Sequence, residues 1–128
     1  MRNRIRAVHV AVILVILIAI LVGVSFYRSH VLCQSRSNAF RLRVARLRAD
    51  AQKEMRIGTR KADVEYFFRS HDIGLRFADG EATGGVRAIG CGPLGCGDIA
   101  AIQISVEVDS DGTVIAEPKV FGYYTDCM

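Results

Sequence analysis

Residues 101–112 read AIQISVEVDSDG. Apolar side chains occupy every second position from Ile102 to Val108, with polar side chains between them, which is the pattern of a β-strand that buries one face. The Asp-Ser-Asp-Gly run that follows predicts a turn that reverses the chain. This stretch therefore predicts an antiparallel sheet with one apolar face.

The flanking sequence predicts further strands of the same sheet. Residues 72–77 alternate in the same way, and residues 78–81 predict a turn. Residues 84–90 predict a second short strand, and residues 113–124 predict a last one. Pro118 lies inside the last strand and cannot donate a ladder hydrogen bond, so this strand is expected at an edge of the sheet.

Two helices are expected before the strands. Residues 38–56 carry apolar or small side chains at a spacing of 4, 3, 4 and 4, and residues 60–70 carry a second apolar face. Asn38 and Thr59 are expected as N-caps of the two helices, and Gly58 as the stop between them. The first apolar stripe is Phe40, Val44, Leu47, Ala51 and Met55, and the second is Val64, Phe67 and Phe68.

Residues 7–26 contain no Asp, Glu, Lys or Arg. Twenty such residues in a helix span ~30 Å, the thickness of the hydrocarbon core of a bilayer. A cleaved signal peptide is the alternative, but its apolar region is typically ~7–15 residues long. Gly23-Val24-Ser25 is also a weak cleavage site, so an uncleaved signal anchor is favoured.

The chain is thus divided into a short tail (1–6), a transmembrane signal anchor (7–26), a linker (27–37) and a soluble domain (38–128). Two helices packed on a three- to four-stranded antiparallel sheet make that domain α+β. Arginines flank the apolar segment on both sides, so charge alone leaves its orientation balanced. Four cysteines favour an oxidising compartment. We therefore expect a single-pass protein of the inner (cytoplasmic) membrane, with its N-terminus in the cytoplasm and its domain on the periplasmic, or extracytoplasmic, side.

Charge is divided unevenly along the chain. Residues 27–61 hold ten Lys or Arg against two acids, whereas residues 62–128 hold four against eleven. Basic side chains beside a bilayer attract anionic headgroups, so the lipid bilayer is an expected partner of the first segment. A solvated helix surface that is rich in arginine is the alternative. An acidic domain beyond a membrane makes nucleic acid an unsuitable partner. The membrane-proximal basic residues are Arg28, Arg36, Arg41, Arg43, Arg46 and Arg48.

The stretch GCGPLGCGD, residues 90–98, contains Cys91 and Cys96 in a loop between two predicted strands. Its glycines and proline suit the turns of a small ring, so a disulfide between these two cysteines is expected. Cys33 and Cys127 are then candidates for a second bridge, although four cysteines allow three pairings. A thiol-active or metal-binding role of Cys91 and Cys96 stays open as the alternative.

Other polar residues are interpreted as structural. His71-Asp72 stands at a helix-to-strand junction and predicts a capping or surface role, and Asp109 and Asp111 predict a turn in place of a calcium loop. We expect no catalytic residue, no cofactor and no small-molecule substrate. The aromatic side chains of Phe121, Tyr123 and Tyr124, on a predicted edge strand, are the candidates for contact with a partner. Ordinary packing of these side chains against the helices is the alternative.

Residues 57–68, IGTRKADVEYFF, resemble the opening of BamE-like (SmpA-like) bacterial envelope domains, whose fold the β-lactamase inhibitor protein shares. The resemblance implies two short helices before a small antiparallel sheet, a place in the cell envelope, and action by binding other proteins. The order of predicted elements agrees with it from about residue 38 to 124. The sequence thus predicts a membrane-anchored, non-catalytic protein-binding or scaffolding module with an envelope protein as partner.

Overall fold

The computed structural model describes residues 2–93 and 96–127, with the side chains of residue 9 and of residues 11 onward within these ranges. The chain divides into two compact units, Met1–Ser35 and Arg36–Met128, which we describe separately. The elements are α1 (Arg2–Glu54), α2 (Lys61–Ser70), β1 (Gly74–Ala78), β2 (Glu81–Ile89), β3 (Ile99–Glu107) and β4 (Lys119–Tyr124).

The first unit is helical throughout its described length. One apolar window in α1 is long enough to cross a bilayer, and none of its described residues is buried within the protein. A signal sequence near the N-terminus shares this length and composition. The side chains of Arg2, Arg4 and Arg6, which bear on the predicted orientation, lie outside the described residues.

The helix α1 continues through residues 27–37, where the sequence predicts a linker. These residues include no glycine and no proline, so nothing in them interrupts the backbone hydrogen bonds of a helix. Asn38 consequently lies in the interior of α1, and its predicted role as an N-cap is wrong.

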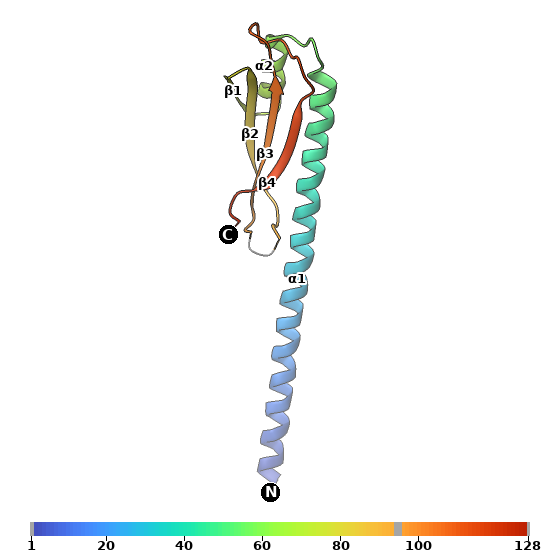
Figure 1. Ribbon diagram of the computed structural model, residues 1–128. Coiled ribbons are helices and arrows are strands. Elements are labelled where there is room, and N and C mark those ends of the chain that lie inside the picture. The colour runs from blue at the N-terminus through green and yellow to red at the C-terminus, as the bar shows by residue number, and fades with distance from the viewer. Residues whose placement is uncertain (1, 94–95, 128) are drawn as a thin grey trace. The chain divides into compact units, whose positions relative to one another are not determined.

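In the second unit, all four strands form one antiparallel sheet in the order β1-β2-β3-β4 (Figure 1). Asp79 and Gly80 join β1 to β2, and both have the positive φ angles that suit the two-residue turns of hairpins. The strand β4 is an edge strand, as predicted from Pro118, and begins directly after that proline. It is shorter than expected, because Val114 forms only an isolated bridge with Val108.

The core lies on one face of this sheet. The C-terminal part of α1 and the helix α2 bury their predicted apolar stripes there, with Val44 half-buried. At Gly84 an added Cβ would approach the Phe68 ring to 2.6 Å, and at Gly122 it would approach the Phe40 ring equally closely. The two glycines therefore let the helices pack directly on the sheet. The buried strand residues are Ala82, Ala88, Ala100, Ile102, Ile104, Val106 and Val120.

The helix α1 ends at Glu54, before the predicted stop at Gly58, which lies in the turn that follows and has a positive φ that few other residues adopt. The N–H of Gly58 donates to the carbonyl of Val114 at 2.8 Å, and the N–H of Val114 donates to the carbonyl of Thr59 at 2.9 Å. The N-cap of α2 is Arg60, which makes no side-chain capping bond. The predicted N-cap Thr59 is therefore wrong, and its Oγ1 instead donates to the carbonyl of Glu54 at 3.4 Å.

Candidate functional site

The face of the sheet opposite α1 and α2, here called the open face, is covered by no element of the described part of the second unit. Side chains alternate between the two faces of a strand, so the residues next to the buried ones along each strand lie on this face. The register pairs Gly85 with Gln103 and Gln103 with Phe121, which places all three in one row across it. The open face is thus a continuous solvent-exposed surface over β1 to β4.

Two of the three predicted contact residues lie together on the open face. Phe121 and Tyr123 are 44% and 43% exposed, and their ring centroids are 6.1 Å apart. Both flank the core-facing Gly122, and Phe121 follows the buried Val120, which explains why the two rings point away from the helices. An aromatic pair of this kind offers a large, rigid contact area to a partner.

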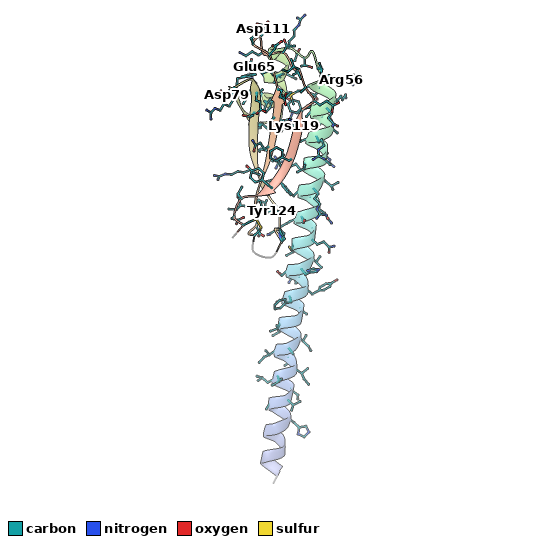
Figure 2. The ribbon with its side chains drawn as sticks, viewed as in Figure 1. Arg56, Glu65, Asp79, Asp111, Lys119 and Tyr124 are labelled. Carbon is teal, nitrogen blue, oxygen red and sulfur yellow. A yellow bond between two sulfur atoms is a disulfide. The ribbon has the colours of Figure 1, made fainter. Side chains whose placement is uncertain are left out.

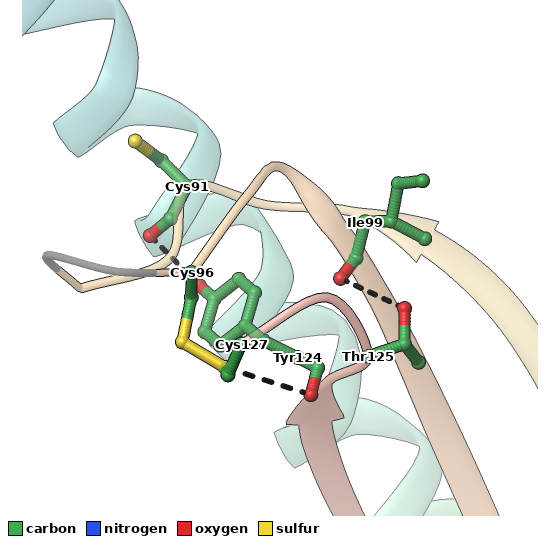
Figure 3. The surroundings of a disulfide bond; sticks show 6 residues. All are labelled: Cys91, Cys96, Ile99, Tyr124, Thr125 and Cys127. Carbon is green, nitrogen blue, oxygen red and sulfur yellow. Dashed lines mark hydrogen bonds between the residues drawn. A yellow bond between two sulfur atoms is a disulfide. The ribbon is translucent and has the colours of Figure 1, made fainter.

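Tyr124, the third predicted contact residue, lies on the helix side. Its ring centroid is 5.6 Å from that of Phe40, and its Oη donates a hydrogen bond to the carbonyl of Cys91 at 3.0 Å (Figure 3). Figure 2 places it at the opposite end of β4 from Lys119. The structure therefore separates Tyr124 from the aromatic pair and gives it a packing role.

A hollow of about 370 Å³ lies on the open face beside the aromatic pair. Gly74 and Gly85 oppose one another on its floor, where neither contributes a side chain. Arg76, Arg87 and Tyr123 are among the residues that line it. Both arginines are exposed, and neither takes part in an ion pair among the described side chains. The hollow therefore presents positive charge next to aromatic surface.

The structure corrects the predicted disulfide between Cys91 and Cys96. Cys96 is bonded to Cys127, 31 residues further along the chain, and the side chain of Cys91 points away from that bond (Figure 3). The reason lies in the pairing of β3 with β4. The hydrogen bond from Thr125 N–H to the carbonyl of Ile99, at 3.1 Å, continues this pairing past the strand end and brings Cys127 opposite Cys96.

The predicted bridge between Cys33 and Cys127 is wrong for the same reason. Cys33 and Cys91 are each disulfide-bonded as well, so none of the four cysteines, all of which lie in the described ranges, is a free thiol. Leu94 and Gly95 of the same loop lie outside the described residues. Cys91 and Cys96 thus do not form the bonded pair on which a thiol-exchange role would depend.

The described side chains also include no cluster of three His, Cys, Asp or Glu able to hold a metal ion. His71 is the C-cap residue of α2, and its Nε2 lies 3.6 Å from a carboxylate oxygen of Asp50. Asp109 accepts hydrogen bonds from the N–H groups of Asp111 and Thr113 at 3.0 and 2.8 Å, which confirms its predicted role in a turn. His71 and Asp109 therefore have structural roles, at a helix end and in a turn.

The six predicted basic residues of α1 differ in the contacts that their side chains make. Arg48 donates two hydrogen bonds to the carbonyl of Val120, from Nε at 3.3 Å and from Nη2 at 2.8 Å, and so joins α1 to β4. Arg36 forms an exposed ion pair with Asp98 at 3.2 Å. All six are exposed, and the other four, Arg28, Arg41, Arg43 and Arg46, are in no ion pair among the described side chains.

Comparison of the chain with protein-family models, with curated proteins and with solved structures finds no match.

Proposed function

We propose that this protein is a single-pass, membrane-anchored module of the cell envelope that binds another protein and carries out no catalysis. In this proposal the apolar part of α1 crosses the inner membrane with its N-terminus in the cytoplasm. The sheet domain then lies on the extracytoplasmic side, where disulfides persist. The Cys96–Cys127 bond supports this placement.

The observation that carries the proposal is the open face. Its aromatic pair Phe121 and Tyr123 adjoins a hollow lined by Arg76 and Arg87, and no helix of the described second unit covers it. Aromatic and arginine side chains are the residue types that contribute most to protein–protein interfaces. The resemblance of residues 57–68 to BamE-like domains points to the same kind of activity.

A photo-crosslinking experiment tests the binding role. p-Benzoylphenylalanine is placed at Phe121 or at Tyr123 of the full chain in living cells. Tyr66, which is 67% exposed on α2, serves as the matched control position. We expect one discrete protein adduct from both open-face positions and none from position 66. Adducts of equal intensity at all three positions, or at none, contradict the proposal.

Thiol labelling tests the location. A membrane-impermeant maleimide added to intact cells is expected to label the cysteines only after a reductant has been added, because all four are disulfide-bonded. Labelling without reductant that requires broken membranes places the domain in the cytoplasm and refutes this part of the proposal.

A further inference from the structure

The strand β2 is longer than its neighbour β1. The partners of β1 in β2 end at Gly85, whereas β3 pairs with β2 as far as Ile89 (Figure 1). Residues 86–89 therefore have a strand on one side only. Four residues of strand span ~14 Å, which is room for a short added strand in line with β1.

The backbone groups on the vacant side can be identified from the ladder. In an antiparallel sheet, the N–H and C=O groups of successive residues point alternately to the two neighbouring strands. The N–H of Gly90 donates to the carbonyl of Asp98 at 2.9 Å, so Gly90 and, two residues before it, Ala88 face the β3 side. Arg87 and Ile89 consequently direct their N–H and C=O groups to the side that lacks a strand.

On the opposite edge of the sheet, a side chain occupies one backbone group of β4. There, the guanidinium of Arg48 donates its two hydrogen bonds to the carbonyl of Val120 on β4. Exposed edges of sheets are sites where a further strand can pair, and proteins commonly cover those that must stay unpaired. Residues 86–89 are therefore open to strand addition, as is the outer side of β1.

A hollow of about 650 Å³ adjoins this edge. It is lined by Ala39, Phe40 and Arg43 of α1 and by Arg87, Ala88, Ile89 and Ile99 of the sheet. We call residues 86–89 together with this lining the edge slot. Ile89 and Ile99 are cross-strand partners, 73% and 54% exposed, and provide apolar surface at one end of the slot.

The charge of the edge slot indicates its occupant. Among the described residues that line it, Arg43 and Arg87 alone are charged, and neither is in an ion pair with another described side chain. A second copy of this chain, paired edge to edge, would bring these arginines against their own equivalents, which like-charge repulsion disfavours. A segment with carboxylate side chains suits the slot instead.

We propose that an extended, acidic segment of a partner protein adds to the sheet as a strand beside residues 86–89 of β2. Its backbone pairs with Arg87 and Ile89, and two neighbouring carboxylates, one on each face of the sheet, meet Arg43 and Arg87. This rests on the proposed function and names the chemistry of the partner. Strand addition of this kind takes its affinity from main-chain hydrogen bonds and its specificity from side-chain pockets.

The test uses two fluorescein-labelled peptides, acetyl-TVTEEVTV and acetyl-TVTKKVTV, and the full chain in neutral detergent. Fluorescence anisotropy is expected to show saturable binding of the glutamate peptide, at least about tenfold tighter than that of the lysine peptide. Equal affinities overturn the proposal, as does a lack of binding of the glutamate peptide at millimolar concentration.

Two variants separate strand addition from simple charge attraction. Ile89→Pro removes an N–H that points to the vacant side and leaves the β3 ladder intact, so it should weaken binding of the glutamate peptide at least about tenfold. Unchanged binding overturns the proposal. If Ile89→Pro fails to fold, the double variant Arg43→Glu with Arg87→Glu is used in its place. It must bind the lysine peptide more tightly than the glutamate peptide, and an unreversed preference overturns the proposal.

A failure of the edge-slot proposal can be distinguished from a failure of the proposed function. Crosslinking from Phe121 and Tyr123 depends on the open face and does not require the edge slot. If discrete crosslinks form but the peptides do not bind selectively, the protein-binding role is supported and the edge slot is not its binding site.

Discussion

The bond between Cys96 and Cys127 gives a prediction whose size follows from the separation of the two residues, which is 31. Closing a loop of that length lowers the entropy of the unfolded chain by ~12 cal/mol/K, which corresponds to about 3.7 kcal/mol at ~25 °C. We expect the double variant Cys96→Ser with Cys127→Ser to fold with a free energy of unfolding that is smaller by this amount. A bond between Cys91 and Cys96 would close about five residues and contribute only about 2 kcal/mol.

Pulse proteolysis in urea is a suitable assay, because the chain has no tryptophan to report unfolding by fluorescence. The full chain is measured in detergent, oxidised, beside the double variant. Peptide mapping without reduction should also find Cys96 and Cys127 in one linked fragment. A loss of stability below about 1 kcal/mol, or a linked fragment that joins Cys91 to Cys96, refutes the reasoning.

The other predictions use the same proteolysis assay. Arg48→Met should cost about 1.5–3 kcal/mol, since the carbonyl of Val120 loses two charge-assisted hydrogen bonds. An unchanged stability contradicts this role of Arg48. Tyr124→Phe should cost about 1 kcal/mol, the typical net contribution of one hydrogen bond. It removes only the bond to Cys91 and keeps the ring on Phe40, so a much larger loss indicates that the hydroxyl has another role. Gly84→Ala should cost about 1–3 kcal/mol, because the new Cβ meets a backbone carbonyl and the Phe68 ring. Gly85→Ala is its control, since a Cβ there has only an ordinary contact of 3.6 Å, and equal losses at the two glycines contradict the packing described for Gly84.

The parts of the fold that depend on local periodicity are predicted well from the sequence. The alternation from Ile102 to Val108 and the helical stripe from Phe40 to Met55 both identify residues that the core buries or half-buries. Burial of side chains repeats with the period of the secondary structure, so the spacing of apolar residues within one segment identifies its buried face. The α+β class follows from these patterns alone.

The features that depend on contacts between distant segments are not predicted. The partner of Cys96 is fixed by the register of β3 against β4. The spacing of residues within 90–98 carries no information about that register. The bond from Arg48 to Val120 and the unequal lengths of β1 and β2 are set in the same way. Each of these requires knowledge of how the strands pair.

The sequence is sufficient to predict which face of β4 each aromatic residue lies on. Phe121 and Tyr123 are two residues apart, so strand periodicity places them on one face, and it places Tyr124 on the other. Grouping the three by composition overlooks the alternation that is so clear in residues 102–108. The continuous helix through residues 27–37 is missed for a related reason, because polar residues are interpreted as a break without any glycine or proline to cause one.

The two margins of the sheet differ, and that difference limits how many molecules can join. A sheet with two available edges can recruit a neighbour on each side, and the neighbours can do the same, which is how strand pairing becomes a fibre. Here Arg48 occupies a carbonyl on β4, so growth on that margin is hindered, while residues 86–89 accept one strand on the other. A molecule with one hindered margin adds strands at the other margin in preference, which disfavours the growth of a fibre.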